Sequence, residues 1–217
     1  MREIFHTELR TLMLDLARMA RLAGEMMTSA STALHQADLS LAEFVISRDD
    51  EMNALHDDTE KRCITLLALQ APVAADLRIV VAAMHAVGDL ERMGNLAQHV
   101  AKIARLKHPN LSIPGSVRPV FARMSLLACR LAEDAATAIE QQDPLSGVRL
   151  AEADDEVDAL RRQLFGILFA ESWSHGVEPA VDAALIGRYY ERFADHAVAI
   201  AHQVGYLATG KLPGEAL

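Results

Sequence analysis

The sequence has 217 residues, of which 51% are hydrophobic but only 5% aromatic, and its formal net charge is −9. This acidic balance disfavours non-specific binding to the phosphate backbone of nucleic acids. The apolar residues are mainly Ala, Leu, Val and Met, a composition typical of helical bundles. Cys63 and Cys129 are the only cysteines, and each lies within a helical pattern. We therefore expect two buried, reduced thiols and no disulfide framework.

The chain begins Met1-Arg2-Glu3 and passes directly into an amphipathic pattern, so no signal peptide is expected. No uncharged run approaches the ~20 residues that a membrane span needs. Together with the acidic charge, these features predict a cytoplasmic protein, peripheral to a membrane at most.

The first hundred residues predict three long helices. From Phe5 onward, apolar residues recur at alternating spacings of four and three, which predicts a helix over residues 3–37. Asp38 can cap a second helix that runs until Pro72 stops it. A third apolar pattern predicts a helix over residues 73–106. These helices form the first expected unit.

The second half of the chain repeats this plan after a proline-rich connection. We expect a first repeat over residues 1–107, a connection over 108–119 and a second repeat over 120–217. The second repeat should hold helices over residues 120–142, from there to about Trp173, and in the last stretch up to Gly210. The sequence therefore predicts an all-α fold of six long helices, arranged as two tandem three-helix bundles.

Matching residues support the internal repeat. Asp143 corresponds to Asp38 at a shift of 105 (143 − 38 = 105), and Glu191 corresponds to Glu91 at a shift of 100 (191 − 91 = 100). A five-residue deletion around the second interhelical turn explains the change of shift.

The most informative feature is a set of oxygen-bearing side chains spaced four apart, because this spacing places two side chains on one face of a helix. Each repeat carries two such pairs, on its second and third helices, and antiparallel neighbours can bring the pairs together. The pairs are Asp49 with Asn53 and Glu91 with Asn95 in the first repeat, then Asp154 with Asp158 and Glu191 with Asp195 in the second.

Carboxylates beside an apolar seam repel one another and lose hydration unless a cation compensates them. Since all the donors are oxygens, the expected cofactor is a divalent or trivalent metal ion such as Mg, Mn or Fe. Asn53 and Asn95 retain carbonyl oxygens but remove two negative charges, so weaker binding is expected in the first repeat. Neighbouring acids could shift this assignment by one residue: Asp50, Glu51, Asp155 and Glu156.

Other polar residues near the pairs leave alternatives open. Three of the histidines near them in sequence could be ligands or hydrogen-bonding groups: His85, His196 and His202. Three arginines near the glutamates could form salt bridges or bind an oxyanion: Arg92, Arg188 and Arg192. The only Glu-x-x-His motif is Glu3 to His6 at the N-terminus, which disfavours a ferritin-like di-iron centre. No nucleophile–base arrangement, glycine-rich phosphate loop or zinc-finger spacing is present, so isolated glycines are expected to serve helix packing: Gly24, Gly88, Gly94, Gly166 and Gly187.

Three stretches resemble the PhoU family of phosphate-transport regulators. They are PVAADLR at 72–78, DLERMGN at 89–95 and RYYERFADHAVAIAHQVGYLATGK at 188–211, within a resemblance that covers essentially the whole chain. The chain departs from the family at Asn95, where Asp is usual, and at Ala194, where Gly is usual. The first departure concerns metal occupancy in the first repeat, and the second is expected to change only packing.

The resemblance implies a non-enzymatic regulator of phosphate uptake and phosphate homeostasis. Such a protein couples the ATPase of a phosphate ABC importer to a sensor histidine kinase and represses phosphate-starvation genes when phosphate is plentiful. It also implies a homodimer and, in some members, multinuclear metal clusters held by paired E/DxxxD motifs. The rival interpretations are a metal-dependent enzyme with a carboxylate-bound two-metal centre and a purely structural helical adaptor.

The apolar stripes of the long helices favour self-association as well, because a three-helix bundle cannot cover them all on its inside.

Overall fold

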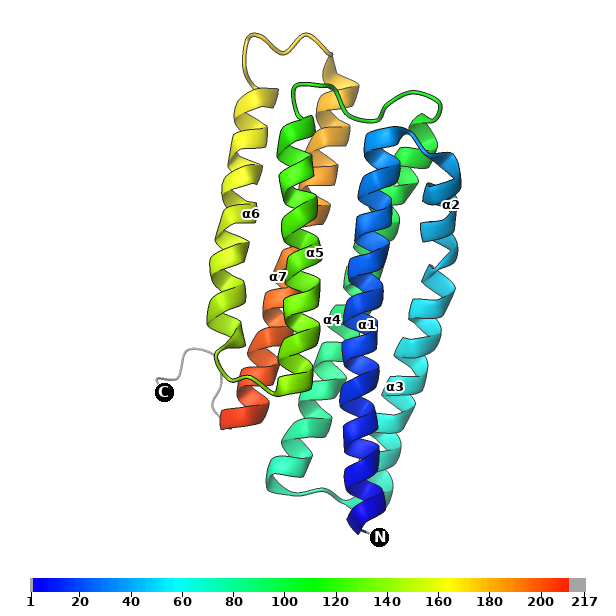
Figure 1. The fold of residues 1–217 in the computed structure, drawn as a ribbon, viewed down its shortest axis with the longest axis vertical. Helices are drawn as coiled ribbons and strands as arrows, with labels where there is room; N and C mark the ends of the chain where they lie inside the picture. The colour runs from blue at the N-terminus through cyan, green and yellow to red at the C-terminus, as the bar shows by residue number, and fades with distance from the viewer. Residues whose placement is uncertain (1, 211–217) are drawn as a thin grey trace.

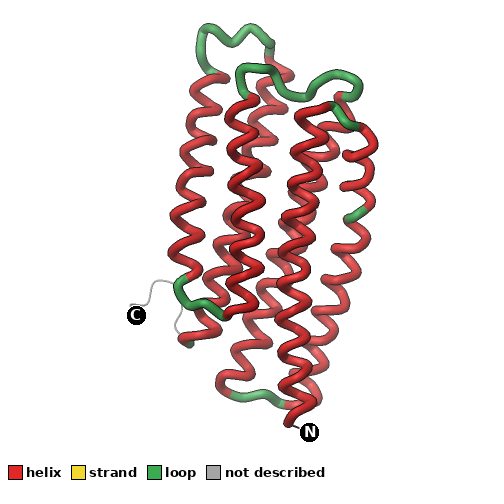
Figure 2. Tube along the Cα trace, viewed as in Figure 1, coloured by secondary structure: helices red, strands yellow, loops and turns green. Residues whose placement is uncertain are grey.

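The computed structural model describes residues 2–210, and all the regular structure in that range is helical (Figure 1, Figure 2), so the all-α prediction is confirmed. The helices of the first repeat are α1 (Arg2–Gln36), α2 (Leu39–Ser47), α3 (Asp49–Gln70) and α4 (Ala74–Lys107). Those of the second are α5 (Arg118–Gln141), α6 (Ser146–Leu168) and α7 (Val177–Thr209). The expected second repeat, and the motif that ends at Lys211, extend into residues 211–217, which lie outside the described range.

The expected second helix is divided at Arg48 into α2 and α3, a break that the apolar pattern did not predict. The Ser47 hydroxyl donates to the Phe44 carbonyl oxygen at 2.7 Å, so a side chain competes for a helical acceptor. The Arg48 backbone N–H is shared between the carbonyls of Phe44 and Val45. The Arg48 side chain also pairs with Glu51, at 3.0 Å. The six-helix plan holds, with one helix interrupted.

The helix expected to reach about Trp173 ends earlier, at Leu168. Trp173 lies in the following turn, where its indole N–H donates to the Gly176 carbonyl oxygen at 2.8 Å. Gly176 has φ +84°, a left-handed conformation that favours glycine, and α7 begins immediately after it. At the other end of α7, Gly210 (φ +74°) terminates the helix as predicted.

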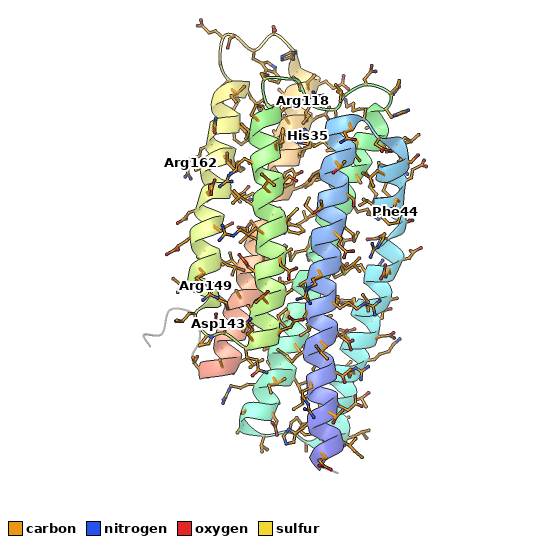
Figure 3. The ribbon with its side chains drawn as sticks, viewed as in Figure 1. His35, Phe44, Arg118, Asp143, Arg149 and Arg162 are labelled. Atoms are coloured by element: carbon orange, nitrogen blue, oxygen red, sulfur yellow. The ribbon has the colours of Figure 1, made fainter. Side chains whose placement is uncertain are left out.

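Matching aspartates precede the second helix of each repeat. Asp38 caps α2 by accepting a hydrogen bond from the Leu41 backbone N–H at 3.0 Å. Asp143, its counterpart, accepts one from the Leu145 N–H at 2.9 Å and pairs with Arg149 at the start of α6 (Figure 3). Each carboxylate accepts a hydrogen bond from a backbone N–H near a helix N-terminus, so the turns before these two helices are alike in their hydrogen bonding as well as in sequence.

The two repeats share one hydrophobic core. Helix α1 packs on both α4 and α5, and α4 packs on α7. Two of these three contacts, α1 with α5 and α4 with α7, join one repeat to the other. Met19 and Met26 of α1 are at most 1% exposed. The second repeat thus covers apolar stripes that a lone three-helix bundle would leave bare. These stripes are therefore covered within the chain and give no separate reason for the self-association expected from them.

Specific contacts fasten the two repeats together. The Tyr190 hydroxyl of α7 lies 2.5 Å from the Ser31 hydroxyl of α1, and both residues are buried. Gly24 of α1 packs so closely on α5 that an added Cβ would lie 2.9 Å from the Ala132 Cβ. Arg21 makes a two-pronged contact with Glu140 at 2.7 and 2.9 Å.

Close packing also accounts for two further glycines, Gly94 and Gly187, but the expectation is wrong for Gly88 and Gly166. A Cβ added at either of those would meet no neighbouring atom within 4 Å. Of the cysteines, Cys63 is buried, whereas Cys129 is only half-buried, with its sulfur 2.7 Å from the Thr28 hydroxyl. Within residues 2–210, no helix is both long and apolar enough to cross a membrane.

Candidate functional site

The structure brings the four acids of the second repeat together where α6 packs against α7. Asp154 and Asp158 belong to α6, and Glu191 and Asp195 belong to α7. Burial of the Asp154 carboxyl, and then the negative charges of Asp195, Asp158, Asp155 and Glu191, raise its pKa to about 6. The pKa of Asp195 is raised by burial and then by Glu191, although the positive charge of Arg188 opposes this. Because the carboxylates of Asp195 and Glu191 on α7 act on Asp154 on α6, the two i, i+4 pairs face each other across the contact between these helices.

Two arginines compensate Glu191, whose side chain is the most buried of the four. Arg188 Nη1 lies 2.5 Å from Glu191 Oε1, within α7. Arg161 Nε of α6 lies 2.8 Å from Glu191 Oε2, an ion pair without the alignment of a hydrogen bond. Sequence reasoning missed Arg161. The available signal was its position seven residues, or two helical turns, after Asp154 on the same face.

The first repeat satisfies its carboxylates differently. Asn95 Nδ2 donates to Glu91 Oε1 at 2.6 Å, and Asn53 Nδ2 donates to Asp49 Oδ2 at 3.4 Å. Each amide therefore bonds to the carboxylate one turn before it, where the second repeat has a second carboxylate. Asp49 faces α4, because its charge acts on His99. The two asparagines thus replace charge repulsion with internal hydrogen bonds.

Two of the four neighbouring acids are engaged by arginines outside the pairs, while the charge of Asp155 acts on Asp154. Glu51 pairs with Arg48 at 3.0 Å and Arg18 at 3.5 Å, and Glu156 pairs with Arg123 of α5 at 2.7 Å. Asp50 and Asp155 are exposed.

Among the described residues, none of these three histidines forms a hydrogen bond or ion pair with the paired carboxylates, although the charge of His196 acts on Asp195. His196 Nδ1 lies 2.9 Å from Asp89 Oδ1 and connects α7 to α4. His202 packs against the start of α6, where a Cβ added at Gly147 would lie 2.8 Å from its Nδ1. His85 is exposed on α4.

The chemistry of the second-repeat donors fits a hard cation, because the ligands are carboxylate oxygens and one of them is unsatisfied. Asp154 Oδ1 is buried and has no hydrogen-bond partner among the described residues, and the same holds for Asp49 Oδ1. Across residues 2–210, however, no three His, Cys, Asp or Glu side chains are placed to hold a metal ion as they stand. Arginine holds Glu191 in this arrangement, so binding a cation there requires the side chains to move.

The fold and the site define an all-α protein built from a duplicated three-helix bundle, with acidic pairs on facing helices, and comparisons with known proteins identify its family. The sequence model for the PhoU domain matches residues 16–104 and 121–204, one stretch within each expected repeat. The chain belongs to the PhoU family.

Relatives and solved structures cover almost the whole chain. The chain is 46% identical to the phosphate-specific transport system accessory protein PhoU homolog 2 of Mycobacterium tuberculosis over 98% of its length and 100% of the relative's. It is 45% identical to PhoU homolog 1 of Mycobacterium leprae over 98% of its length and 96% of the relative's. Its fold matches the crystal structure of PhoU from Pseudomonas aeruginosa with a TM-score of 0.84 and 26% identity, covering 95% of this chain and 100% of the other.

Proposed function

We propose that this protein regulates phosphate uptake and phosphate homeostasis by coupling a phosphate ABC importer to a sensor histidine kinase. In this role it contacts the importer's ATPase and the kinase, and represses phosphate-starvation genes when phosphate is plentiful. The observation that carries the proposal is the full-length similarity to proteins named as phosphate-specific transport system accessory proteins. The same names support the broader statement that the chain acts in regulating phosphate transport. We place it in the cytoplasm, at the inner face of the importer.

Two measurements in the source cells test this role. A deletion strain carrying a reporter for a phosphate-starvation promoter should express the reporter in phosphate-replete medium, and a plasmid copy of the gene should silence it. Affinity capture from replete cells should recover both the ATPase and the kinase. Normal repression in the deletion strain, or recovery of neither partner by a chain that complements, contradicts the proposal.

We also propose that the protein is not an enzyme. The Glu191 carboxylate is neutralised by two arginines, which leaves it poorly suited to act as a general base. The competing proposal, a hydrolase with a two-metal centre, predicts turnover of phosphate esters by the metal-loaded protein and loss of that turnover in Asp195→Ala. Such turnover would replace the regulatory proposal with the enzymatic one.

The second-repeat acids are our proposed metal ligands: Asp154, Asp158, Glu191 and Asp195. A divalent or trivalent cation (Mg, Mn or Fe) bound there would neutralise their repulsion and cross-link α6 to α7. The corresponding residues of the first repeat are a weaker proposed site: Asp49, Asn53, Glu91 and Asn95. Inductively coupled plasma mass spectrometry on protein purified without chelators tests occupancy, and a metal-free, fully functional protein would contradict it.

A homodimer is the proposed assembly. Large apolar side chains remain exposed where α1 begins and α3 ends, near the N-terminus in Figure 1, and they include Ile4, Leu69 and Val73. Sedimentation velocity at micromolar concentration should show a dimer. A monomer at that concentration would remove this assembly from the proposal.

A further inference from the structure

A cavity at the junction of the two repeats has an unusual lining for an acidic protein. It lies between α4 and α7 and has a volume of about 220 Å³. None of its eight lining residues is acidic, and three are arginines: Arg92, Asn95, Leu96, His99, Arg188, Tyr189, Arg192 and His196. Pockets for drug-sized ligands usually measure about 300–1,000 Å³. The size and lining therefore suit a small anion.

The repeat explains how the arginines come to meet there. Arg92 and Arg192 are equivalent residues (192 − 92 = 100), and each follows the glutamate of its own acidic pair. Adjacent residues on a helix point about 100° apart. In the second repeat Glu191 therefore faces α6 and its partner Arg161, while Arg192 lines the cavity toward α4. The same Glu-Arg step in each repeat brings one arginine from each half of the chain to a shared space.

The charges around the cavity are incompletely balanced. Arg192 makes no ion pair with any of the residues from 2 to 210, and Arg92 has only Glu91, at 3.7 Å and without a hydrogen bond. Arg188 is bound to Glu191 at 2.5 Å, but that carboxylate is shared with Arg161. Since guanidinium groups bind oxyanions with paired N–H donors, unbalanced arginines around a cavity are suited to a tetrahedral oxyanion.

The remaining walls hold the cavity in shape. The Tyr189 ring of α7 stacks on the His99 ring of α4, with centroids 5.2 Å apart and planes 22° apart. His196 Nδ1 is fixed by Asp89 of α4 at 2.9 Å, so the imidazole is oriented before any ligand arrives. Both contacts cross from one repeat to the other and fix the separation of the two helices that supply the arginines.

We propose that this cavity is a binding site for a phosphate-type oxyanion, held between the two repeats by Arg92 and Arg192 with Arg188 beside them. The ligand is either free inorganic phosphate or the phosphoryl group of a small molecule such as a nucleotide. The assignment concerns binding by the purified chain, so it does not depend on the proposed regulatory role.

Isothermal titration calorimetry with inorganic phosphate, in a buffer without other oxyanions, tests the proposal. Arg92→Gln and Arg192→Gln should each weaken binding about tenfold or more, because each removes charged hydrogen bonds. Arg162→Gln is the matched control, since this exposed arginine lies on α6, away from the cavity (Figure 3), and should bind like the parent chain. Thermal unfolding of each variant identifies losses caused by misfolding, and Arg192→Lys, which keeps the charge, should lose less than Arg192→Gln.

Parallel titrations with ADP and ATP distinguish the sources of the phosphate group. Binding of inorganic phosphate that depends on Arg92 and Arg192 supports the free anion. Binding of a nucleotide alone, with the same dependence, supports the phosphoryl group of a larger ligand. No binding of either class at millimolar concentration, or an equal loss in Arg162→Gln, overturns the proposal.

Discussion

The acid cluster of the second repeat should make the protein less stable as it ionises. Asp154 is half-buried, and its pKa is raised from an ordinary 3.8 to about 6 by burial and by the carboxylates around it. The folded state therefore binds more protons than the unfolded state between these two values. Its free energy of unfolding should fall as pH rises from about 4 to about 6, and the penalty should persist at pH 7.

The size of the penalty follows from the shift. One pKa unit corresponds to about 1.4 kcal/mol, so two units set an upper limit of about 3 kcal/mol. Because solvent screens a half-exposed carboxyl, we expect about 1 kcal/mol. Asp154→Asn removes the charge while keeping the shape, and should raise the free energy of unfolding by about this amount at pH 7.

Urea denaturation followed by circular dichroism, with a chelator present, measures the effect at pH 4.5 and pH 7. Asp154→Asn should be more stable than the parent chain at pH 7, and the difference should shrink at pH 4.5. Glu152→Gln is the control, since it removes one charge from an exposed position on the same helix and should change stability little at either pH. Equal stability of Asp154→Asn and the parent at pH 7 would refute the reasoning.

Three further predictions test the two sites and the contacts that support the fold. Asp195→Asn should weaken metal binding in the second repeat, and Asn95→Asp should strengthen it in the first. Calorimetric metal titration of both variants and anomalous diffraction measure this. Equal occupancy of the two sites in the parent chain would contradict the charge argument. Tyr190→Phe should lower the free energy of unfolding by only about 1 kcal/mol, because the Ser31 hydroxyl left behind still donates to a backbone carbonyl 2.6 Å away. A loss near zero in urea denaturation would mean that the hydrogen bond between the two hydroxyls does not stabilise the contact between the repeats. Asp38→Ala should cost about 1 kcal/mol by removing the cap of α2, and an unchanged denaturation midpoint would show that water replaces the carboxylate without loss.

Local sequence determined the helices, their caps and the acidic pairs. Alternating apolar spacings predicted α1 and α4 because side chains four residues apart share one face of a helix. Asp38, Pro72 and Gly210 mark helix ends by backbone chemistry that acts within a few residues. The same short-range periodicity placed Glu191 and Asp195 on one face. The break at Arg48 was missed, because no proline or glycine marks it.

Only the tertiary structure decided which groups meet across helices. Packing of α6 on α7 brings Arg161 to Glu191, and packing of α4 on α7 places Arg92 and Arg192 around one cavity. Packing of α5 on α1 also places the second repeat over the apolar stripes of α1. Helical periodicity fixes the direction of a side chain around its own axis, but the partner it meets depends on how the helices pack, and no spacing within one helix encodes that.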